Sequence, residues 1–348
     1  MPQQNLSYAE RFNQALQKEH NKVFDDSGKL KDDIAEYINI CPVCASEVST
    51  VYTVKDGFIH KKCDSCSFIY VSPRLNEEAT HAFYNSSVNE VYNETKFHDP
   101  NEVLSLDDQD NLANYKIIDS RVPQKTGKKL LEIGPGKGTF LRKAHQDGFE
   151  VHAIELNKTL IEQHRPFCKE IYEEDLLSLN LQNHFFDVIY FRDVMEHIPD
   201  VIPFLTRIRK ILRPGGLVVI DTHNIDSFVN QIAGKYHTVL FAFEHPVHWS
   251  PKTLEKAGKI AGLKMEKVFF GDRDFTIQRA LNYHLTPSFT YIFPPRINPL
   301  KRFILLVATN FLALPLVRDA DKALSKKLAL SLNKGAKMQM LLTKEQND

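Results

Sequence analysis

The clearest pattern of apolar and polar positions lies between residues 128 and 157. Leu130, Leu131 and Ile133 form a short apolar run, which predicts a buried parallel strand. The glycine-rich segment 134–138 predicts a tight turn, and 139–146 predicts a helix that stops before Gly148. A second strand is predicted over 149–154, and it ends on Glu155. The segment therefore predicts a β-α-β unit with a glycine turn after its first strand and an acid after its second.

The alternation of helical and extended patterns continues along the chain. It predicts, in order, a helix over 160–165, strands over 171–175 and 185–191, a helix over 203–212, a turn over 213–216, a strand over 217–221, a helix over 252–261 after Ser250 and Pro251, and a strand over 263–270. Strands that alternate with helices predict an α/β fold built on a mainly parallel sheet.

An insertion with its own apolar runs follows the last of these strands. Residues 276–334 carry apolar stretches over 303–308 and 311–314, which fall short of the ~20 apolar residues that span a bilayer. A buried or lid helix explains them. Because Lys301, Arg302 and Arg318 flank the runs, a helix that lies on a membrane surface through 300–317 is the second interpretation.

The N-terminal third shows a different pattern, with cysteines in place of long apolar runs. Residues 1–38 are polar with helical spacing of Tyr8, Phe12 and Leu16, which predicts a surface helix. Two Cys-x-x-Cys pairs follow, and a hairpin pattern with a turn at Asp56–Gly57 separates them. This spacing predicts a zinc ribbon, and four thiolates leave no open position, so the ion would be structural. The predicted ligands are Cys41, Cys44, Cys63 and Cys66.

Composition narrows the class of protein. The chain has 348 residues, enough for two domains or for one domain with additions, and its 44 basic and 44 acidic residues balance. This balance argues against sequence-independent binding to nucleic acid. The N-terminus lacks an apolar signal-peptide core, and the remaining cysteine, Cys168, fits a buried small side chain. Paired cysteines that bind metal fit a reducing compartment, so we expect a cytoplasmic protein, with the inner face of the membrane as the alternative location.

The glycine turn carries a family resemblance. Glu-x-Gly-x-Gly-x-Gly, from Glu132 to Gly138, resembles motif I of the class I S-adenosylmethionine (SAM) methyltransferases. Glycines let the backbone approach a ligand, and an acid after the second strand can bind ribose hydroxyls. The resemblance implies a Rossmann-like seven-stranded fold whose last strand, 337–343, is antiparallel. The residues implied in SAM binding are Glu132, Gly134, Pro135, Gly136, Gly138, Glu155, Leu156, Asp175, Leu176, Arg192 and Asp193.

The N-terminal part also resembles zinc-containing methyltransferases of glycan and natural-product pathways. In that resemblance, the Ser-Pro-Arg and Phe-Tyr motifs after the second cysteine pair belong to a segment over the active site. Tyr84 and Tyr92 are then substrate candidates, although packing tyrosines are common. The acidic stretch 99–111 fits either a lid or a linker.

The loops after the fifth strand carry the acid–base candidates. Asn224, within Asn-x-x-Ser, and the segment from Glu244 to Pro251 resemble the substrate-side loops of the family. A histidine beside a carboxylate suits a general base near neutral pH, so His245 with Glu244 is the predicted base, and His197 and His248 are the next candidates. His248 is also a substrate candidate. The related sugar C-methyltransferases have a catalytic tyrosine where this chain has Ala242, which favours O-methylation.

These observations predict six segments and one preferred function. The segments are a helical extension (1–38), the zinc ribbon (39–72), a helical lid or substrate segment (73–125), the SAM-binding core (126–275), a helical insertion (276–334) and a final strand with its tail (335–348). The preferred function is transfer of a methyl group from SAM to a small, carbohydrate-containing acceptor. An RNA methyltransferase whose ribbon binds RNA and a non-catalytic assembly protein with this fold are the alternatives.

Overall fold

The computed structural model describes residues 7–96, 106–271, 276–285 and 298–345. The chain divides into two compact units. The first comprises Met1–Lys96, His223–Ser250 and Phe270–Lys337, and the second comprises Phe97–Thr222, Pro251–Phe269 and Met338–Asp348. Each unit is therefore assembled from segments that are far apart in the sequence.

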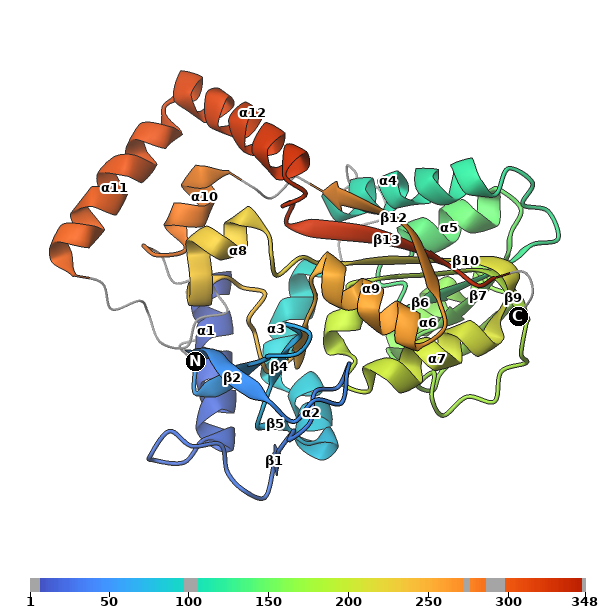
Figure 1. The fold of residues 1–348 in the computed structure, drawn as a ribbon, viewed down its shortest axis with the longest axis horizontal. Coiled ribbons are helices and arrows are strands. Elements are labelled where there is room, and N and C mark those ends of the chain that lie inside the picture. The colour runs from blue at the N-terminus through green and yellow to red at the C-terminus, as the bar shows by residue number, and fades with distance from the viewer. Residues whose placement is uncertain (1–6, 97–105, 272–275, 286–297, 346–348) are drawn as a thin grey trace. The chain divides into compact units, whose positions relative to one another are not determined.

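The second unit is built on a seven-stranded sheet (Figure 1), in the order β12-β13-β10-β9-β6-β7-β8. Strands β6, β7, β8, β9 and β10 pair in parallel. Strand β13 runs the other way along β10, because Gly215 near the start of β10 donates to the carbonyl of Lys344 while Asn224 at its end donates to that of Ala336. The bounds are β6 Lys129–Ile133, β7 Glu150–Ile154, β8 Glu170–Tyr172, β9 Phe186–Arg192, β10 Leu212–His223, β12 Lys264–Gly271 and β13 Lys337–Thr343.

Helices cover both faces of this sheet because neighbouring strand residues point to opposite sides. On β9, the ring of Tyr190 stacks on Phe140 of α5 at 3.8 Å, whereas Phe191 packs edge-on against Phe204 of α7. Helix α4 joins α5 on the first face, where its Tyr115 and Ile118 enter the core. The bounds are α4 Leu106–Arg121, α5 Thr139–Gln146, α6 Lys158–His164, α7 Val201–Ile211 and α9 Pro251–Ile260.

The first unit contains the predicted hairpin within a four-stranded sheet, in the order β11-β4-β3-β2. Asp56 and Gly57 both have positive φ, as the tight turn between β2 and β3 requires. Phenylalanines from distant segments, such as Phe12, Phe58 and Phe243, form its core. The bounds are α1 Tyr8–Val23, β1 Ala35–Glu36, β2 Ser49–Lys55, β3 Phe58–Cys63, β4 Ile69–Val71, β5 Arg74–Leu75, α2 Glu77–Tyr84, α3 Ser87–Lys96, α8 Phe228–Ala233, β11 Val247–His248, α10 Ile277–Asn282, α11 Pro299–Ala313 and α12 Pro315–Ser331.

Three predicted elements differ from the structure. The N-terminal helix ends at Val23, because Phe24 is extended and pairs with Leu30, and residues 35–36 form a strand. The predicted turn over 213–216 is an irregularity inside β10, where the register with β9 shifts between Leu212 and Leu217. The strand predicted over 171–175 ends at Tyr172. The remaining core elements agree within two residues, and β13 spans the predicted 337–343.

Candidate SAM site and cysteine cluster

The glycine loop after β6 has a backbone that glycine adopts far more easily than other residues. Gly134, Gly136 and Gly138 have φ values of 66°, 54° and 73°. A Cβ built on Gly136 meets no atom within 4 Å, so one side of the loop is open. Backbone N–H groups can thus approach a ligand there, while Pro135 between the glycines lacks an N–H and stiffens the turn.

Glu132, within β6, is a buried acid in need of a partner. Its side chain is 3% exposed, and among the described residues no group forms a hydrogen bond with Oε2. Burial raises the pKa of Glu132 well above its ordinary value, and the negative charge of Glu155 adds to this rise. A cationic group of a ligand would satisfy this carboxylate, since buried charges are stable only when they are paired.

Glu155 follows β7 and is oriented by the backbone. Its Oε1 accepts hydrogen bonds from the N–H groups of Leu156 and Asn157, each at 2.8 Å. Asn157 in turn caps the N-terminus of α6. The Leu156 side chain is exposed beside the acid. This is the arrangement in which an acid after the second strand binds ribose hydroxyls.

Asp175 and Leu176 lie in the turn after β8. Asp175 is exposed, and its Oδ1 accepts from the backbone of Leu177 at 2.8 Å, which stabilises the turn. Leu176 is buried. The implied role of Asp175 in SAM binding stays a prediction.

Arg192 and Asp193 lie where β9 ends, beside the end of β10. Arg192 is within 4 Å of three carboxylates, those of Asp110 on α4, Asp193 and Asp221. Asp193 has a φ of 52°, and its N–H donates to the carbonyl of Asp221. The turn after β9 is therefore fixed by both charge and backbone.

The next predicted residue, His197, closes a short 3₁₀ turn over Met195–His197 and is half-buried. The adjacent Glu196 is buried and accepts a hydrogen bond from the hydroxyl of Thr222 at 2.8 Å. This contact joins the segment after β9 to the end of β10. Sequence reasoning did not include Glu196.

His164, the last residue of α6, was also missed. Its ring is buried, and Nε2 donates to the carbonyl of Gly136 at 2.9 Å, since a carbonyl can only accept. A Cβ on Gly138 would lie 2.5 Å from Cε1 of the same ring. His164 therefore packs against the glycine loop and stabilises it through the contacts with Gly136 and Gly138. No local pattern could reveal this contact, because it joins residues 28 positions apart.

The first unit holds the acid–base candidates Glu244 and His245. Nδ1 of His245 lies 2.9 Å from the carbonyl of Val239 and must donate to it, so Nε2 carries the lone pair of the neutral ring. That tautomer is the one a general base requires. Glu244 is half-buried beside it.

The predicted substrate residues have different environments. Asn224 is buried and bonds to backbone, since its Nδ2 donates to Gly335 and its Oδ1 accepts from Asp226. His248 is buried in β11, with Nε2 3.0 Å from Nδ1 of His60. Tyr84 is exposed, at 39%. The side chain of Tyr92 and residues 99–105 of the predicted acidic stretch lie outside the described parts of the chain, and residues 106–111 of that stretch belong to α4.

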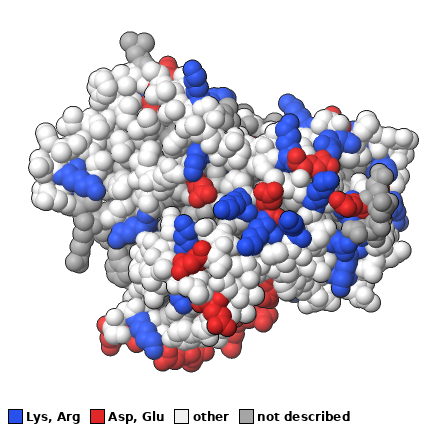
Figure 2. Space-filling model, viewed as in Figure 1, with Lys and Arg blue, Asp and Glu red and all other residues white. Residues whose placement is uncertain are grey.

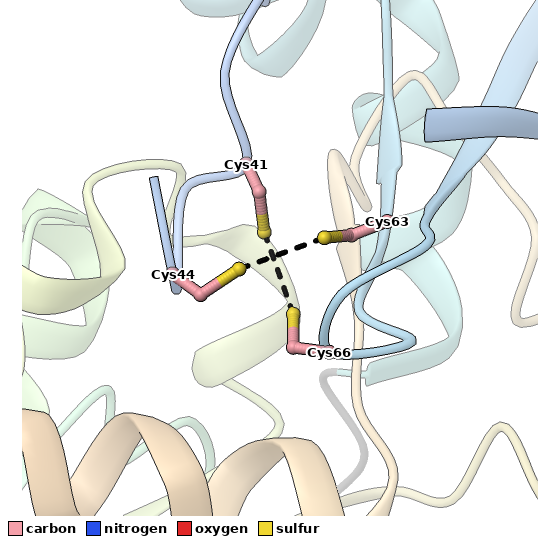
Figure 3. Close-up of side chains that lie close together, drawn as sticks. All are labelled: Cys41, Cys44, Cys63 and Cys66. Carbon is pink, nitrogen blue, oxygen red and sulfur yellow. Dashed lines mark hydrogen bonds between the residues drawn. The ribbon is translucent and has the colours of Figure 1, made fainter. Parts of the chain in front are cut away.

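The four paired cysteines form a compact cluster (Figure 3). Cys41 and Cys66 have their Sγ atoms 3.6 Å apart, as do Cys44 and Cys63, and all four Sγ atoms lie within 4.8 Å of one another. A tetrahedral ion with Zn–S bonds of ~2.3 Å places its sulfurs ~3.8 Å apart, so the cluster fits zinc. Cys168 is half-buried, and burial raises its pKa to about 12.

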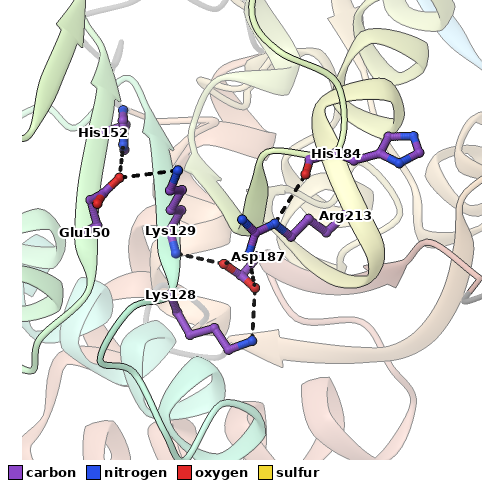
Figure 4. A network of polar contacts seen from close by, with 7 residues as sticks. All are labelled: Lys128, Lys129, Glu150, His152, His184, Asp187 and Arg213. Carbon is purple, nitrogen blue, oxygen red and sulfur yellow. Dashed lines mark hydrogen bonds and ion pairs between the residues drawn. The ribbon is translucent and has the colours of Figure 1, made fainter.

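A polar network lies at the amino ends of strands β6 and β9 (Figure 4), whereas the glycine loop follows the carboxyl end of β6. Asp187, near the start of β9, accepts from Nζ of Lys128 at 3.1 Å, from the N–H of Lys129 at 2.9 Å and from Arg213 at 3.0 Å. Ligands of open α/β sheets bind at the carboxyl ends of strands. This network at the amino ends therefore stabilises the sheet. The candidate site lies at the carboxyl ends of the strands.

The sheet order, the antiparallel last strand, the glycine loop after β6 and the acid after β7 define the class I methyltransferase fold. Residues 109–268 match the family described as "Methyltransferase domain". Residues 109–268 are therefore similar to a methyltransferase domain.

Known relatives share this domain. Phosphoethanolamine N-methyltransferase 2 of Caenorhabditis elegans is 33% identical over 121 residues, which cover 32% of this chain and 27% of that protein. Ubiquinone biosynthesis O-methyltransferase of Shewanella sp. is 28% identical over 133 residues, which cover 36% of this chain and 56% of the relative. A solved structure of phosphoethanolamine N-methyltransferase 2 from Haemonchus contortus in complex with S-adenosyl-L-methionine is 19% identical, with a TM-score of 0.40 over 68% of this chain and 53% of that one. The chain thus spans less than two thirds of the length of these proteins.

Proposed function

We propose that this protein transfers the methyl group of SAM to the hydroxyl of a small, carbohydrate-containing acceptor. Two observations carry the proposal: the buried Glu132, whose Oε2 has no hydrogen-bond partner among the described residues, and the open side of the loop at Gly136. Together they offer a negative group and accessible backbone to a cationic nucleoside. The family match of residues 109–268 supports methyl transfer. Bound SAM supplies a methyl group on a positively charged sulfur.

The roles of this chain's residues follow from their contacts. Glu132 and the loop at Gly134–Gly138 would hold the amino-acid part of SAM, and Glu155, oriented by two N–H groups, would hold the ribose. His245 is the proposed base that takes the proton of the acceptor hydroxyl at Nε2, since Nδ1 donates to Val239. Ala242, where related sugar C-methyltransferases have a tyrosine, supports oxygen as the methylated atom.

Transfer from labelled SAM to a cell extract, with the product identified by mass spectrometry, tests the proposed activity. We expect a labelled, carbohydrate-containing product of low mass. His245→Ala should lower turnover by about 10²-fold or more with little change in SAM affinity. A labelled RNA, an unlabelled extract, or full activity of the His245 variant would contradict the proposal.

We also propose that Cys41, Cys44, Cys63 and Cys66 bind one structural zinc ion. Their sulfur separations support it, and a metal ion would fix the two cysteine-bearing loops next to the β2–β3 hairpin. Metal analysis should find one zinc per chain, and Cys63→Ser should lose it and expose the β2–β3 hairpin to protease. Cys168→Ser, the matched control, should keep both the metal and the resistance. Full protease resistance after chelation would contradict a structural role.

A further inference from the structure

Helix α11 carries a stripe of large apolar side chains that face solvent. Counting about 100° per residue, the side chains fall within roughly a 100° arc of the helix, the width that normally packs against a core. Each of them is between 52% and 67% exposed. The described parts of the chain leave this stripe open. We define the α11 stripe as Leu300, Phe303, Ile304, Val307, Phe311 and Leu314.

The opposite side of α11 packs against the rest of its unit, so the stripe faces solvent. Thr309 is buried there, Leu305 and Leu312 are half-buried, and Gln278 of α10 donates to the carbonyl of Thr309 at 3.2 Å. The short helix α10 is in turn held by Asp321 of α12, whose carboxylate accepts from two N–H groups at its start. The helix thus already uses one face for packing, and the stripe is its other face.

The charges around the stripe have one sign. Residues 275–318 contain five Lys or Arg residues and no Asp or Glu, although the whole chain is neutral. Lys301 and Arg302 lie in the first turn of α11, and Arg318 follows its end. Figure 2 shows the surface over α11 as mostly uncharged, with basic side chains. Long basic side chains near the ends of an apolar helix can reach anionic headgroups while the apolar side chains contact the acyl region.

The length of the helix and the charges near it indicate what covers the α11 stripe: a bilayer that it spans, a second copy of the chain, or a membrane surface. No described helix is by itself long and apolar enough to cross a bilayer, and the pair that passes when taken together, α11 with Val317–Ala329, is bent by 96°. A second copy of the chain would bring basic ends against basic ends in any twofold pairing of the stripe, which is unfavourable. An anionic lipid surface complements both the apolar stripe and the basic residues near the two ends of α11.

We propose that α11 binds the surface of membranes that contain anionic phospholipid, with its stripe in the boundary between headgroups and acyl chains. This goes beyond the proposed methyl transfer and does not depend on it. The full zinc-loaded chain is mixed with vesicles of phosphatidylcholine, with or without phosphatidylglycerol, and bound protein is measured by flotation. We expect binding to be about tenfold stronger with phosphatidylglycerol, and weaker at high salt.

Two variants locate the contact. Ile304→Asp with Val307→Asp should abolish flotation, whereas Val51→Asp with Val54→Asp, the same kind of change at exposed positions of β2, should leave it unchanged. Lys301→Glu with Arg302→Glu should remove the preference for anionic vesicles, and it tests the proposal even if the first variant is unstable. Circular dichroism checks folding of each variant.

Several results would overturn the proposal. The proposal fails if the wild type does not float with either vesicle, or if Ile304→Asp with Val307→Asp floats as well as the wild type. It also fails if Val51→Asp with Val54→Asp loses flotation to the same extent. Finally, it fails if Lys301→Glu with Arg302→Glu keeps the wild-type preference for anionic vesicles. A dimer in light scattering that the stripe variant dissociates would assign the stripe to a second copy instead. Each readout is independent of SAM, so a failed methyl transfer leaves the result interpretable.

Discussion

Single residues in the second unit show how burial prepares a binding site. Glu132 lies near the end of β6 and Glu155 directly follows the neighbouring β7, and the charge of Glu155 contributes to the raised pKa of Glu132. Two N–H groups stabilise the charge of Glu155, whereas Oε2 of Glu132 has no such support. Burial therefore favours the neutral form of Glu132, and a cationic ligand can reverse this preference.

We predict that SAM binding releases a proton from Glu132. In the free protein its raised pKa favours the neutral acid, and an ammonium group favours the carboxylate, so SAM affinity should rise with pH until Glu132 ionises unaided. Glu132→Gln should weaken SAM binding by about tenfold or more and abolish proton release. Calorimetry in two buffers of different ionisation enthalpy measures the release. Equal release by the wild type and the variant would assign the proton to another group.

A second prediction concerns the buried histidine of the first unit. Burial lowers the pKa of His60 to about 3, and the charge of Lys55 adds to this. Because the unfolded chain holds that proton near pH 6.5, the folded state loses stability as pH falls from 6.5 towards 3. His60→Leu should therefore lose about 2 kcal/mol less free energy of unfolding than the wild type between pH 6.5 and pH 5.

Denaturant unfolding at the two pH values measures this difference. His81→Leu, at an exposed position of α2 in the same unit, is the control and should keep the wild-type pH dependence. Acid release of the proposed zinc ion would affect all three proteins alike and cancel in the comparison. An unchanged acid slope in the His60 variant would show that other groups cause it.

At the scale of elements, the sequence pattern predicted those helices and strands whose limits depend on residues close in the sequence. The strand β6 and the helix α5 were predicted to within a residue, because each has its own apolar pattern between clear breaks, and the family resemblance predicted β13 over the same residues. Errors occurred where distant contacts decide. The extended segment at Phe24 pairs with Leu30, and the Arg213–Gly216 segment stays in β10 because the last strand pairs with it through Lys344.

The glycine loop gives a prediction for two of its glycines, Gly136 and Gly138. Alanine at either Gly136 or Gly138 is strained by about 1–2 kcal/mol, because both have positive φ. Only Gly138→Ala would also strike the ring of His164, so it should lower the melting temperature by several degrees more. Gly136→Ala should instead weaken SAM binding with the smaller loss of stability. Thermal melts and calorimetry of both variants test this, and equal melting temperatures would refute the assigned support by His164.

At the scale of the whole molecule, each compact unit combines segments that are far apart in the sequence. The sequence predicted six consecutive segments, whereas the structure groups residues 223–250 and 270–337 with the N-terminal region. Helix α4, expected in a lid or substrate segment, contributes Tyr115 and Ile118 to the core on the sheet. Such groupings depend on packing between distant residues, which a single sequence does not reveal. Local motifs did predict the sheet class, the glycine loop and the clustering of the four cysteines.

The central claim is that the glycine loop and the acid after β7 hold SAM, and calorimetric titration of the full chain with SAM tests it most directly. We predict binding of one SAM per chain, weakened by about tenfold or more in Glu155→Ala, since the ribose loses its acceptor. Glu150→Ala, at the other end of the same strand, should bind like the wild type. No heat of binding, or equal binding by Glu155→Ala and the wild type, would contradict the account.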